Sequence, residues 1–447
     1  MFEATIYDSE NLVWRHFTEA SALYIAKVAD DVGEVLDAVE AACAEGRYAV
    51  GYISYEAASG LDSALTHHDP GGLPLAVFAV FEDNHETSLG VSSTALDLSP
   101  VISQSDFGNS IRRIKAYLES GDAYQVNFTH PLRGVAEMSP ETVFSFLYQA
   151  QPSQYSAFIE TEEFAICSVS PELFFELNGT SIRMEPMKGT RPRGRFSRED
   201  SELRLDLIGS EKDRAENLMI VDMVRNDLSK ISLTGTVRTE ELFSIKKFPT
   251  VWQKVSSINA ETNASLKDVF SALFPCASVT GAPKARTMEI IRELEFQERG
   301  VYTGAIGLVK PGRRAKFSVA IRTLTIDKQK KQAMYGVGGG IVWDSDADEE
   351  WKESLTKGKI LSFESPSFQL LETMLFEPEV GVSLLDFHLE RLEDSADYFD
   401  FAIDLNIIRK HLISLQFSSP SKLRLMLSPD GHYELEAHQL TDSKVEL

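Results

Sequence analysis

The sequence predicts an α+β fold with largely antiparallel sheets, followed by a small α/β piece at the C-terminal end. Strand-length runs recur at hairpin-like spacing, and amphipathic helical stretches are interspersed among them. The stretch 362–367 contains Ser and Pro and is typical of a hinge, so residues 368–447 are expected to form a separate piece. A chain of 447 residues with 43% hydrophobic content can bury a large core.

The N-terminal region, residues 1–92, mixes both signals and is taken as part of the main fold. Val28–Cys43 has the apolar spacing of an amphipathic helix, and Tyr48–Tyr55 has the composition of a strand. The stretch Ser92–Ser105 is rich in Ser and shows little periodicity, which predicts a linker or loop.

The central region, residues 106–363, is expected to carry the main function. Asp106 can cap a helix that runs to about Ser120 and is ended by Gly121. The predicted strands are Tyr124–Leu132, Phe164–Val169, Leu173–Leu177, Val301–Val309, Lys316–Ile326 and Ala333–Val337. The predicted helices are Pro140–Ala150, Glu211–Leu228, Ala285–Glu295 and Asp348–Leu361, the second with an apolar stripe of Leu218, Val221, Val224 and Leu228.

The overall charge is acidic. The chain has 44 Lys and Arg against 68 Asp and Glu, a net charge of −24, so a broad nucleic-acid surface is not expected. An anionic substrate would therefore have to be bound by local cations or by a metal ion.

The cysteines and the N-terminus indicate a cytoplasmic protein. Cys43, Cys167 and Cys276 are scattered without a CxxC pair, which suits a reducing compartment and argues against a disulfide framework or a zinc cluster. The first residues do not resemble a signal peptide, and no apolar run approaches the roughly 18 residues needed to span a membrane.

Lys188 is the most informative single residue. A lysine is a nucleophile only when neutral, and a free pKa of about 10.4 keeps it protonated at pH 7. Burial or nearby positive charge lowers that pKa, and Arg191 and Arg193 place such charge close by. Gly189 would let another group approach the backbone. The same pattern also fits a surface lysine in a basic loop.

Two carboxylates on separate predicted helices form a candidate metal site. Glu216 and Glu353, together with water and a substrate carboxylate, would suit Mg²⁺, which prefers oxygen ligands. The alternative is that Glu353 and Lys357, at i and i+4, form an exposed helix pair.

Anion recognition is indicated at two places. Arg322 closes an apolar strand and could fork onto a carboxylate, or could mark an exposed strand end. The run Gly336–Gly340 could cradle an anion with its N–H groups, or could form a bulge or tight turn. The run does not match the dinucleotide pattern G-x-G-x-x-G, because Ile341 stands at the last position, so a dinucleotide site is rejected.

Glu172, in Ser170-Pro171-Glu172, opens a predicted strand. A carboxylic acid there could act as a general acid if its surroundings raised its pKa. Read alone, such a glutamate is more often solvated.

Together these segments resemble the chorismate-binding enzyme family. The resemblance is strong over about 110–363 and looser over 1–92. The matching segments follow the family order: Gly121–Asn127, Ser170–Glu172, Lys188–Arg193, Ala215–Asn217 with Arg225–Asp227, Gly281–Lys284, Tyr302–Gly304, Val319–Thr323, Gly338–Gly340, and Glu353 with Lys357. The family fold, a sandwich of antiparallel sheets flanked by helices, is expected to follow.

The resemblance implies a role for each matched residue. Lys188 and Glu172 are the expected catalytic pair, as covalent nucleophile and general acid, and Glu216 and Glu353 are the expected Mg²⁺ ligands. Tyr302 and Arg322 are expected to hold the enolpyruvyl carboxylate of chorismate. The expected substrate-binding set is Tyr302, Arg322, Lys357, Ser278, Gly338, Gly339, Thr190 and Gln125.

Two positions choose among the family's activities. Isochorismate and salicylate synthases have a water-activating lysine where this chain has Gln125, which disfavours water addition. Anthranilate synthases typically have Ala where this chain has Lys188, and commonly a His near Gln253. The resemblance therefore favours aminodeoxychorismate synthesis, with anthranilate synthesis as the alternative and a silent scaffold for an amidotransferase as a third.

Ammonia would come from solution or from a separate glutamine amidotransferase subunit, because the chain has no Gly-x-Cys-x-Gly motif. The segment 368–447 resembles the start of aminodeoxychorismate lyase, a pyridoxal phosphate enzyme, through Leu370–Met374 and His388–Ala396. The resemblance places Arg391 near the cofactor phosphate. The cofactor's lysine normally lies further along the chain, so no lyase activity is expected, and the segment is taken as a truncated fusion or a packing remnant.

Overall fold

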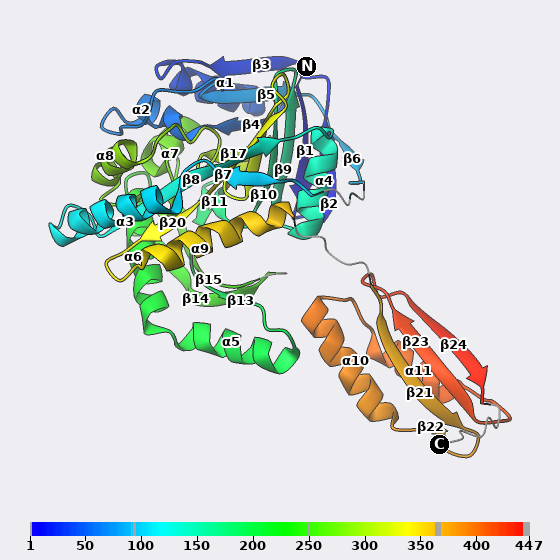
Figure 1. The fold of residues 1–447 in the computed structure, drawn as a ribbon. Coiled ribbons are helices and arrows are strands. Elements are labelled where there is room, and N and C mark those ends of the chain that lie inside the picture. The colour runs from blue at the N-terminus through cyan, green and yellow to red at the C-terminus, as the bar shows by residue number, and fades with distance from the viewer. Residues whose placement is uncertain (1, 91, 93–94, 249–250, 363–367, 441–447) are drawn as a thin grey trace. The chain divides into compact units, whose positions relative to one another are not determined.

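The computed structural model describes residues 2–90, 92, 95–248, 251–362 and 368–440. Contacts divide the chain into two units (Figure 1). The first comprises Met1–Arg191 and Leu207–Glu364, and the second comprises Pro192–Asp206 and Ser365–Leu447. The described residues include no helix that combines the length and apolar character of a membrane crossing.

The first unit is built on two antiparallel sheets. Within the described residues, one sheet has the order β16 (Gly281–Ala282), β8 (Gln125–Val135), β20 (Gln332–Ile341), β19 (Thr323–Asp327), β10 (Phe164–Ser170), β9 (Tyr155–Thr161), β1 (Phe2–Asp8), β2 (Val13–Phe17), β6 (His85–Thr87), with β7 (Leu98–Pro100) beside β8. The other has the order β13 (Met187–Pro192), β15 (Val251–Glu261), β12 (Ser181–Met184), β11 (Leu173–Asn178), β18 (Arg314–Val319), β17 (Ala305–Lys310), β4 (Tyr48–Ile53), β5 (Ala76–Phe81), β3 (Ala22–Ala26), with β14 (Arg238–Lys247) beside β15.

The sheets pack face to face around an aromatic core. Phe2 and Phe17 of the first sheet and Tyr52 and Phe81 of the second belong to one buried cluster. Apolar burial of this kind is the main favourable term in folding. The predicted sandwich is therefore confirmed.

Helices cover the outer faces of the sandwich. On the second sheet lie α1 (Asp31–Ala44), α6 (Glu211–Ser229) and α7 (Leu266–Leu273), with the short α2 (Ala58–Leu61) beside them. The first sheet carries α4 (Pro140–Ala150) and, around β8 and β20, α3 (Gln104–Glu119), α8 (Lys284–Leu294) and α9 (Ala347–Gly358). Three-residue 3₁₀ turns occur at Tyr55–Ala57, Ala277–Val279 and Lys359–Leu361.

Three predicted strands were clearly wrong in extent, and one of them, Ala333–Val337, was too short, because β20 continues to Ile341. The stretch Lys316–Ile326 is not one strand: it divides into β18 and β19, which belong to different sheets. The chain turns between them at Arg322, whose φ is +50°. Val301–Val309 was also too long, because the strand begins only at Ala305.

Two helix predictions also need correction. The cap of α3 is Ser103, whose hydroxyl accepts from the Asp106 amide, so the helix starts earlier than predicted. In α6, Leu218 is exposed, and the buried stripe contains Ile220 with Val221, Val224 and Leu228.

The two predicted connections are only partly described. Within Ser92–Ser105, residues Leu98–Pro100 form strand β7 instead of loop. Residues 93–94 of this connection, and residues 363–367 of the predicted hinge, lie outside the described residues.

The second unit has its own sheet and core. Its strands are ordered β22 (Gly381–Val382), β21 (Leu370–Glu377), β23 (Ser421–Leu427), β24 (Tyr433–Gln439), and α10 (Leu385–Phe399) and α11 (Leu405–Ser414) share its buried apolar cluster. Along β21, alternate residues are buried and exposed, as expected for a sheet covered on one face. Residues 192–206, which include most of α5 (Ser197–Gly209), group with this unit, although the predicted boundary assigned them to the central region.

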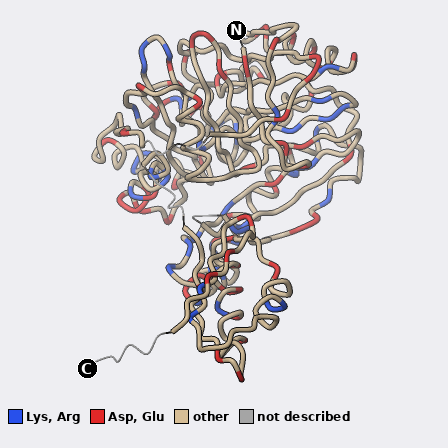
Figure 2. The backbone as a smooth tube through the Cα atoms, turned by 90° about the vertical axis from the view of Figure 1, so that its right-hand side faces the viewer, with Lys and Arg blue, Asp and Glu red and all other residues tan. Residues whose placement is uncertain are grey.

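Figure 2 shows Lys and Arg interspersed with Asp and Glu along the whole backbone tube. The net charge of −24 is therefore not concentrated in one segment. An anionic substrate must therefore be bound by individual Lys or Arg side chains within a site.

Candidate active site

Lys188 lies on β13, an edge strand of the second sheet, and its amine faces a carboxylate. Its Nζ is 3.3 Å from Oε2 of Glu216 on α6. The next residue of α6, Asn217, donates its side-chain amide to the Lys188 carbonyl oxygen at 3.4 Å and accepts from Ser256 Oγ at 2.6 Å. These contacts hold the strand that carries the lysine against the helix that carries the glutamate.

A glycine on the opposite sheet makes room for the lysine. A Cβ added at Gly340 of β20 would lie 3.0 Å from Lys188 Nζ and 2.9 Å from the Gln125 side-chain amide. Gln125, on β8, is 1% exposed, and neither its amide oxygen nor its amide nitrogen has a hydrogen-bond partner among the described residues. An unpartnered buried amide is costly unless something else satisfies it, so this side chain is available for a bound molecule.

The carboxylates of α9 lie near the same glycine strand. A Cβ at Gly339 would be 3.3 Å from Glu350 Oε2 and 3.8 Å from Glu353 Oε1. Lys357 Nζ is 2.8 Å from Glu353 Oε1 and donates to the Gly338 carbonyl oxygen at 2.7 Å. The i and i+4 ion pair considered for Glu353 and Lys357 is thus present. It lies beside β20, the strand that carries Gly338 and Gly339.

The two glutamates of α9 have opposite pKa shifts. The Lys357 ammonium is the largest influence on Glu353 and lowers its pKa. Burial, with the nearby Glu353 charge adding to it, raises the pKa of Glu350. The Lys188 charge acts on both carboxyls, which places them within electrostatic reach of that amine.

These carboxylates are the donor type that Mg²⁺ prefers. In the part of the chain that the structure describes, no three His, Cys, Asp or Glu side chains are grouped as a metal site. Glu216 pairs with Lys188 and Glu353 with Lys357 instead. The donor chemistry fits the ion, and magnesium binding stays a prediction.

Glu172 is a buried acid beside the lysine. It precedes β11, is 4% exposed, and its Oε1 has no hydrogen-bond partner among the described residues. Burial raises its pKa to about 7, opposed in part by a hydrogen bond with Ser278, by the Met187 amide and by the Lys188 charge. A carboxyl with this pKa is protonated often enough near neutral pH to give up a proton.

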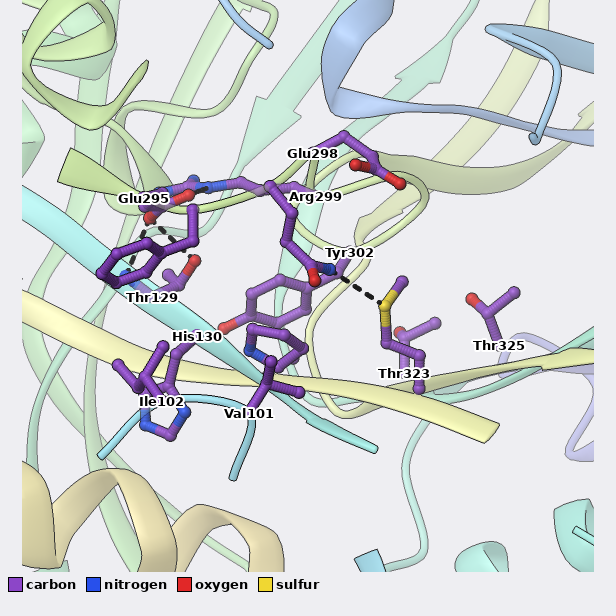
Figure 3. A pocket seen from close by; sticks show the side chains of 15 residues that line it. Val101, Ile102, Thr129, His130, Glu295, Glu298, Arg299, Tyr302, Thr323 and Thr325 are labelled. Atoms are coloured by element: carbon purple, nitrogen blue, oxygen red, sulfur yellow. Dashed lines mark hydrogen bonds and ion pairs between the residues drawn. The ribbon is translucent and has the colours of Figure 1, made fainter. Parts of the chain in front are cut away.

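Tyr302 lines a pocket with Arg299, Thr129, His130 and Thr323 (Figure 3). Its ring packs on β20, where a Cβ at Gly336 would lie 2.2 Å from a ring carbon. Burial raises the pKa of its phenol, which therefore stays protonated and able to donate.

Arg322 lies in the turn between β18 and β19 and is tied to α9. Its Nη1 donates to the Lys357 carbonyl oxygen, and the Tyr335 hydroxyl donates to the same oxygen at 3.3 Å. The charge of Arg322 acts on the Tyr302 phenol, so these two predicted carboxylate-binding residues are neighbours.

Most of the predicted site residues come together. Six of them converge on one end of β20: Lys188, Gln125, Gly338, Gly339, Glu353 and Lys357. Glu216 contacts Lys188, and Glu172 and Ser278 lie beside that lysine. Tyr302 and Arg322 lie further along the same sheet. Thr190 is exposed on β13, two residues beyond Lys188.

Two features were missed by sequence reasoning. Glu350 precedes Glu353 by three residues, and this spacing on a predicted helix could have identified it. Arg299 is buried and forks onto Glu295 at 2.7 and 2.8 Å, three residues before Tyr302. That pair could not be predicted from the sequence, because the burial of both residues depends on contacts with β8.

The site thus combines a lysine amine, a raised-pKa acid, several carboxylates and two further cations around a glycine strand. This set can bind an anionic compound and carry out nucleophilic substitution with a proton supplied to the leaving group.

Comparison with known proteins decides the family. Residues 4–362 match the family model described as chorismate binding enzyme. The chain belongs to the chorismate-binding enzyme family. All the site residues above, and both sheets apart from the first two residues of β1, lie within the matched range of this family member.

Two kinds of curated relative match this chorismate-binding enzyme family member. Anthranilate synthase component 1 1 of Haloarcula marismortui is 40% identical over 257 residues, which are 57% of this chain and 52% of that protein. Aminodeoxychorismate synthase component 1 of Escherichia coli is 41% identical over 258 residues, 57% of this chain and 56% of that protein. The matches therefore span about half the length of these relatives, and identity does not choose between the two activities.

The family fold is also found among solved structures. Anthranilate synthase component I from Streptococcus pneumoniae superposes with a TM-score of 0.66 at 24% identity, over 81% of this chain and 90% of that chain. This agreement confirms the fold and carries no further functional weight.

Proposed function

We propose that this chain is an aminodeoxychorismate synthase component 1, which converts chorismate and ammonia to 4-amino-4-deoxychorismate. The observation that carries the proposal is the position of Lys188, whose Nζ lies 3.3 Å from Glu216 Oε2 and 3.0 Å from where a Cβ at Gly340 would be. A lysine there is the feature by which the sequence favoured this activity over anthranilate synthesis. The product would lead to p-aminobenzoate and folate.

The reaction then divides between two side chains. The unprotonated Lys188 amine bonds to C2 of the ring while the C4–O bond breaks, and Glu172 gives its proton to the departing oxygen, which leaves as water. Ammonia next bonds to C4, the C2–N bond breaks, and the lysine amine returns to its free state. Splitting one substitution into two is the usual gain of covalent catalysis.

The remaining residues bind and orient. Arg322 and Tyr302 hold the enolpyruvyl carboxylate, and Lys357 with the Gly338 and Gly339 amides faces the ring carboxylate. Mg²⁺, held by Glu216 and Glu353 with Glu350 nearby, would neutralise that carboxylate and favour charge shift in the ring. Gln125, which lacks a basic nitrogen, would not activate water.

Ammonia is expected from a glutamine amidotransferase subunit, a partner that the name component 1 of the relatives suggests. Cys43, Cys167 and Cys276 are buried free thiols, which supports the predicted reducing, cytoplasmic setting.

Lys188→Ala tests the covalent step. With chorismate, Mg²⁺ and ammonium as nitrogen donor, we expect aminodeoxychorismate formation to fall by about 10³-fold or more, because the two-step route is lost. Product chromatography is the measurement, and any anthranilate that appears instead is detected by its fluorescence. Unchanged aminodeoxychorismate formation would remove the covalent role.

Anthranilate synthesis is the second candidate, because the Haloarcula marismortui relative named for it matches this chain as well, at 40% identity, as the aminodeoxychorismate synthase relative does at 41%. The wild-type chain separates the two in the same assay. Fluorescent anthranilate as the main product would replace the first proposal with the second.

A further inference from the structure

The second unit contains a stretch from the middle of the chain. Residues 192–206, named here the inserted segment, group with Ser365–Leu447. The inserted segment follows directly after β13, which carries Lys188, and its chain continues through α5 into α6, which carries Glu216. It therefore links the proposed nucleophile to the residue that its amine contacts.

Arg193 fixes the start of the inserted segment. Its side chain is 8% exposed and forks onto Asp200, with Nε and Nη2 each 2.8 Å from a carboxylate oxygen. The Gly194 amide donates to the same carboxylate at 2.8 Å. A Cβ at Gly194 would lie 2.2 Å from the Asp200 backbone nitrogen, so this tight turn requires glycine.

The C-terminal helix α10 holds this turn through Tyr398. Arg193 Nη2 donates to the Tyr398 carbonyl oxygen at 3.0 Å, and the guanidinium lies 5.1 Å from the centre of the Tyr398 ring. The Tyr398 hydroxyl donates to the Gly194 carbonyl oxygen. One turn earlier on α10, Asp394 accepts from the Ser197 hydroxyl at 2.6 Å. Buried charge-assisted forks and cation–π contacts are the strong kind of polar contact.

Both ends of the stretch are fixed in the first unit. Arg191 is 3.0 Å from Asp213, and the Ser210 hydroxyl accepts from the Asp213 amide as the cap of α6. The path from Lys188 to Glu216 is thus fastened at its ends in one unit and at its middle in the other.

We propose that residues 368–440 act as a clamp that binds the inserted segment through Tyr398 and Asp394 and thereby positions Lys188 and Glu216 for the reaction. The clamp is a positioning device, since Tyr398 and Asp394 hold the inserted segment whereas the reacting amine lies on β13. Its catalytic half rests on the proposed function, whereas the binding of the segment does not.

Hydrogen exchange of the full-length chain tests the binding. Tyr398→Ala removes both the ring under Arg193 and the hydroxyl on Gly194, and we expect amides of residues 193–206 to exchange about ten-fold faster. Tyr398→Phe keeps the ring and should show a smaller increase. Arg409→Gln is the matched control, because its exposed ion pair with Asp386 lies in the same unit without touching the inserted segment. Protection of Ser421–Leu427 reports whether the C-terminal core still folds.

Steady-state turnover of chorismate tests the positioning. We expect kcat of Tyr398→Ala to fall about ten-fold with KM for chorismate nearly unchanged, because binding groups stay while the reacting groups lose alignment. The kcat of Tyr398→Phe should fall less than that of Tyr398→Ala, and the kcat of Arg409→Gln should match the wild type.

Exchange in 193–206 that is equal in Tyr398→Ala and wild type would overturn the clamp. Faster exchange with unchanged kcat would overturn its positioning role. A wild-type chain that consumes no chorismate would sink the proposed function alone, since the exchange comparison would still decide whether the segment is bound.

Discussion

Glu172 shows how one residue can be tuned for chemistry by its surroundings. The side chain is 4% exposed, and one of its oxygens has no partner among the described residues. Burial therefore dominates over the Ser278 hydrogen bond and the Lys188 charge, and the pKa rises to about 7. A surface glutamate would be almost fully ionised at pH 7 and would hold no proton to give.

The pH dependence of kcat follows from this shift. The protonated acid is the active form, so we expect kcat to fall about ten-fold per pH unit above about 7 as Glu172 ionises. Glu172→Gln should be slow at every pH and lack this limb. A wild-type profile that stays flat up to pH 9 would exclude Glu172 as the acid.

The stability of Glu172→Gln relative to the wild type should also depend on pH. Because burial raises the folded-state pKa above its ordinary value of 4.5, the contribution of Glu172 to stability is fully present below pH 4.5 and is lost as the pH rises through about 7. Thermal melts should thus show Glu172→Gln gaining on the wild type between pH 5 and pH 8.

At the scale of elements, strand β20 organises the site through its glycines. Gly336 receives the Tyr302 ring, Gly339 faces the α9 carboxylates, and Gly340 faces Lys188 and Gln125. Side chains from β8, β13, α9 and the turn before β17 have room here because β20 carries glycine at positions 336, 339 and 340.

Gly340→Ala should therefore cost activity more than stability. The added methyl meets the flexible ends of Lys188 and Gln125 and must push them aside, so we expect kcat/KM to fall about 10²-fold while the melting temperature changes little. Gly108→Ala on α3, where the nearest atom is 4.0 Å away, is the control and should keep full activity. Retained activity in Gly340→Ala would mean that the amine does not react from this position.

The elements also mark how far the sequence could be followed. Helices such as α4 and strands such as β10 were predictable, because their caps and periodicities are local. The division at Arg322 was not, since the apolar run continues through it and only pairing with two different sheets breaks the strand. Burial of Gln125 and Glu172 likewise depends on distant strands. The matched motifs identified most of the site, whereas Glu350 and Arg299 needed the coordinates.

At the scale of the whole molecule, two cores share one chain. The smaller core holds Glu372, whose carboxylate accepts from Arg391 and lies 2.7 Å from His388 Nδ1. Arg391, the residue that the resemblance placed near a cofactor phosphate, is thus engaged within its own unit.

We accordingly expect the purified chain to carry no pyridoxal phosphate. The Arg391 guanidinium is held by the Glu372 carboxylate, so an added phosphate would compete with an existing fork. The absorbance spectrum after incubation with the cofactor and removal of the excess is the measurement. An absorbance band at about 400 nm or above that stays with the protein, as a bound Schiff base would give, would contradict this expectation.

The route of the backbone between the two cores limits how the molecule can be taken apart. The main chain passes from the larger unit to the smaller one after Arg191, comes back at Leu207, and crosses once more near Glu364. Cleaving the backbone at the last crossing would leave a C-terminal fragment that still contacts residues 192–206. The smaller unit is therefore made of two separate segments of the chain. Transferring it to another protein would require both coding segments, 192–206 and 365–447, to be moved together.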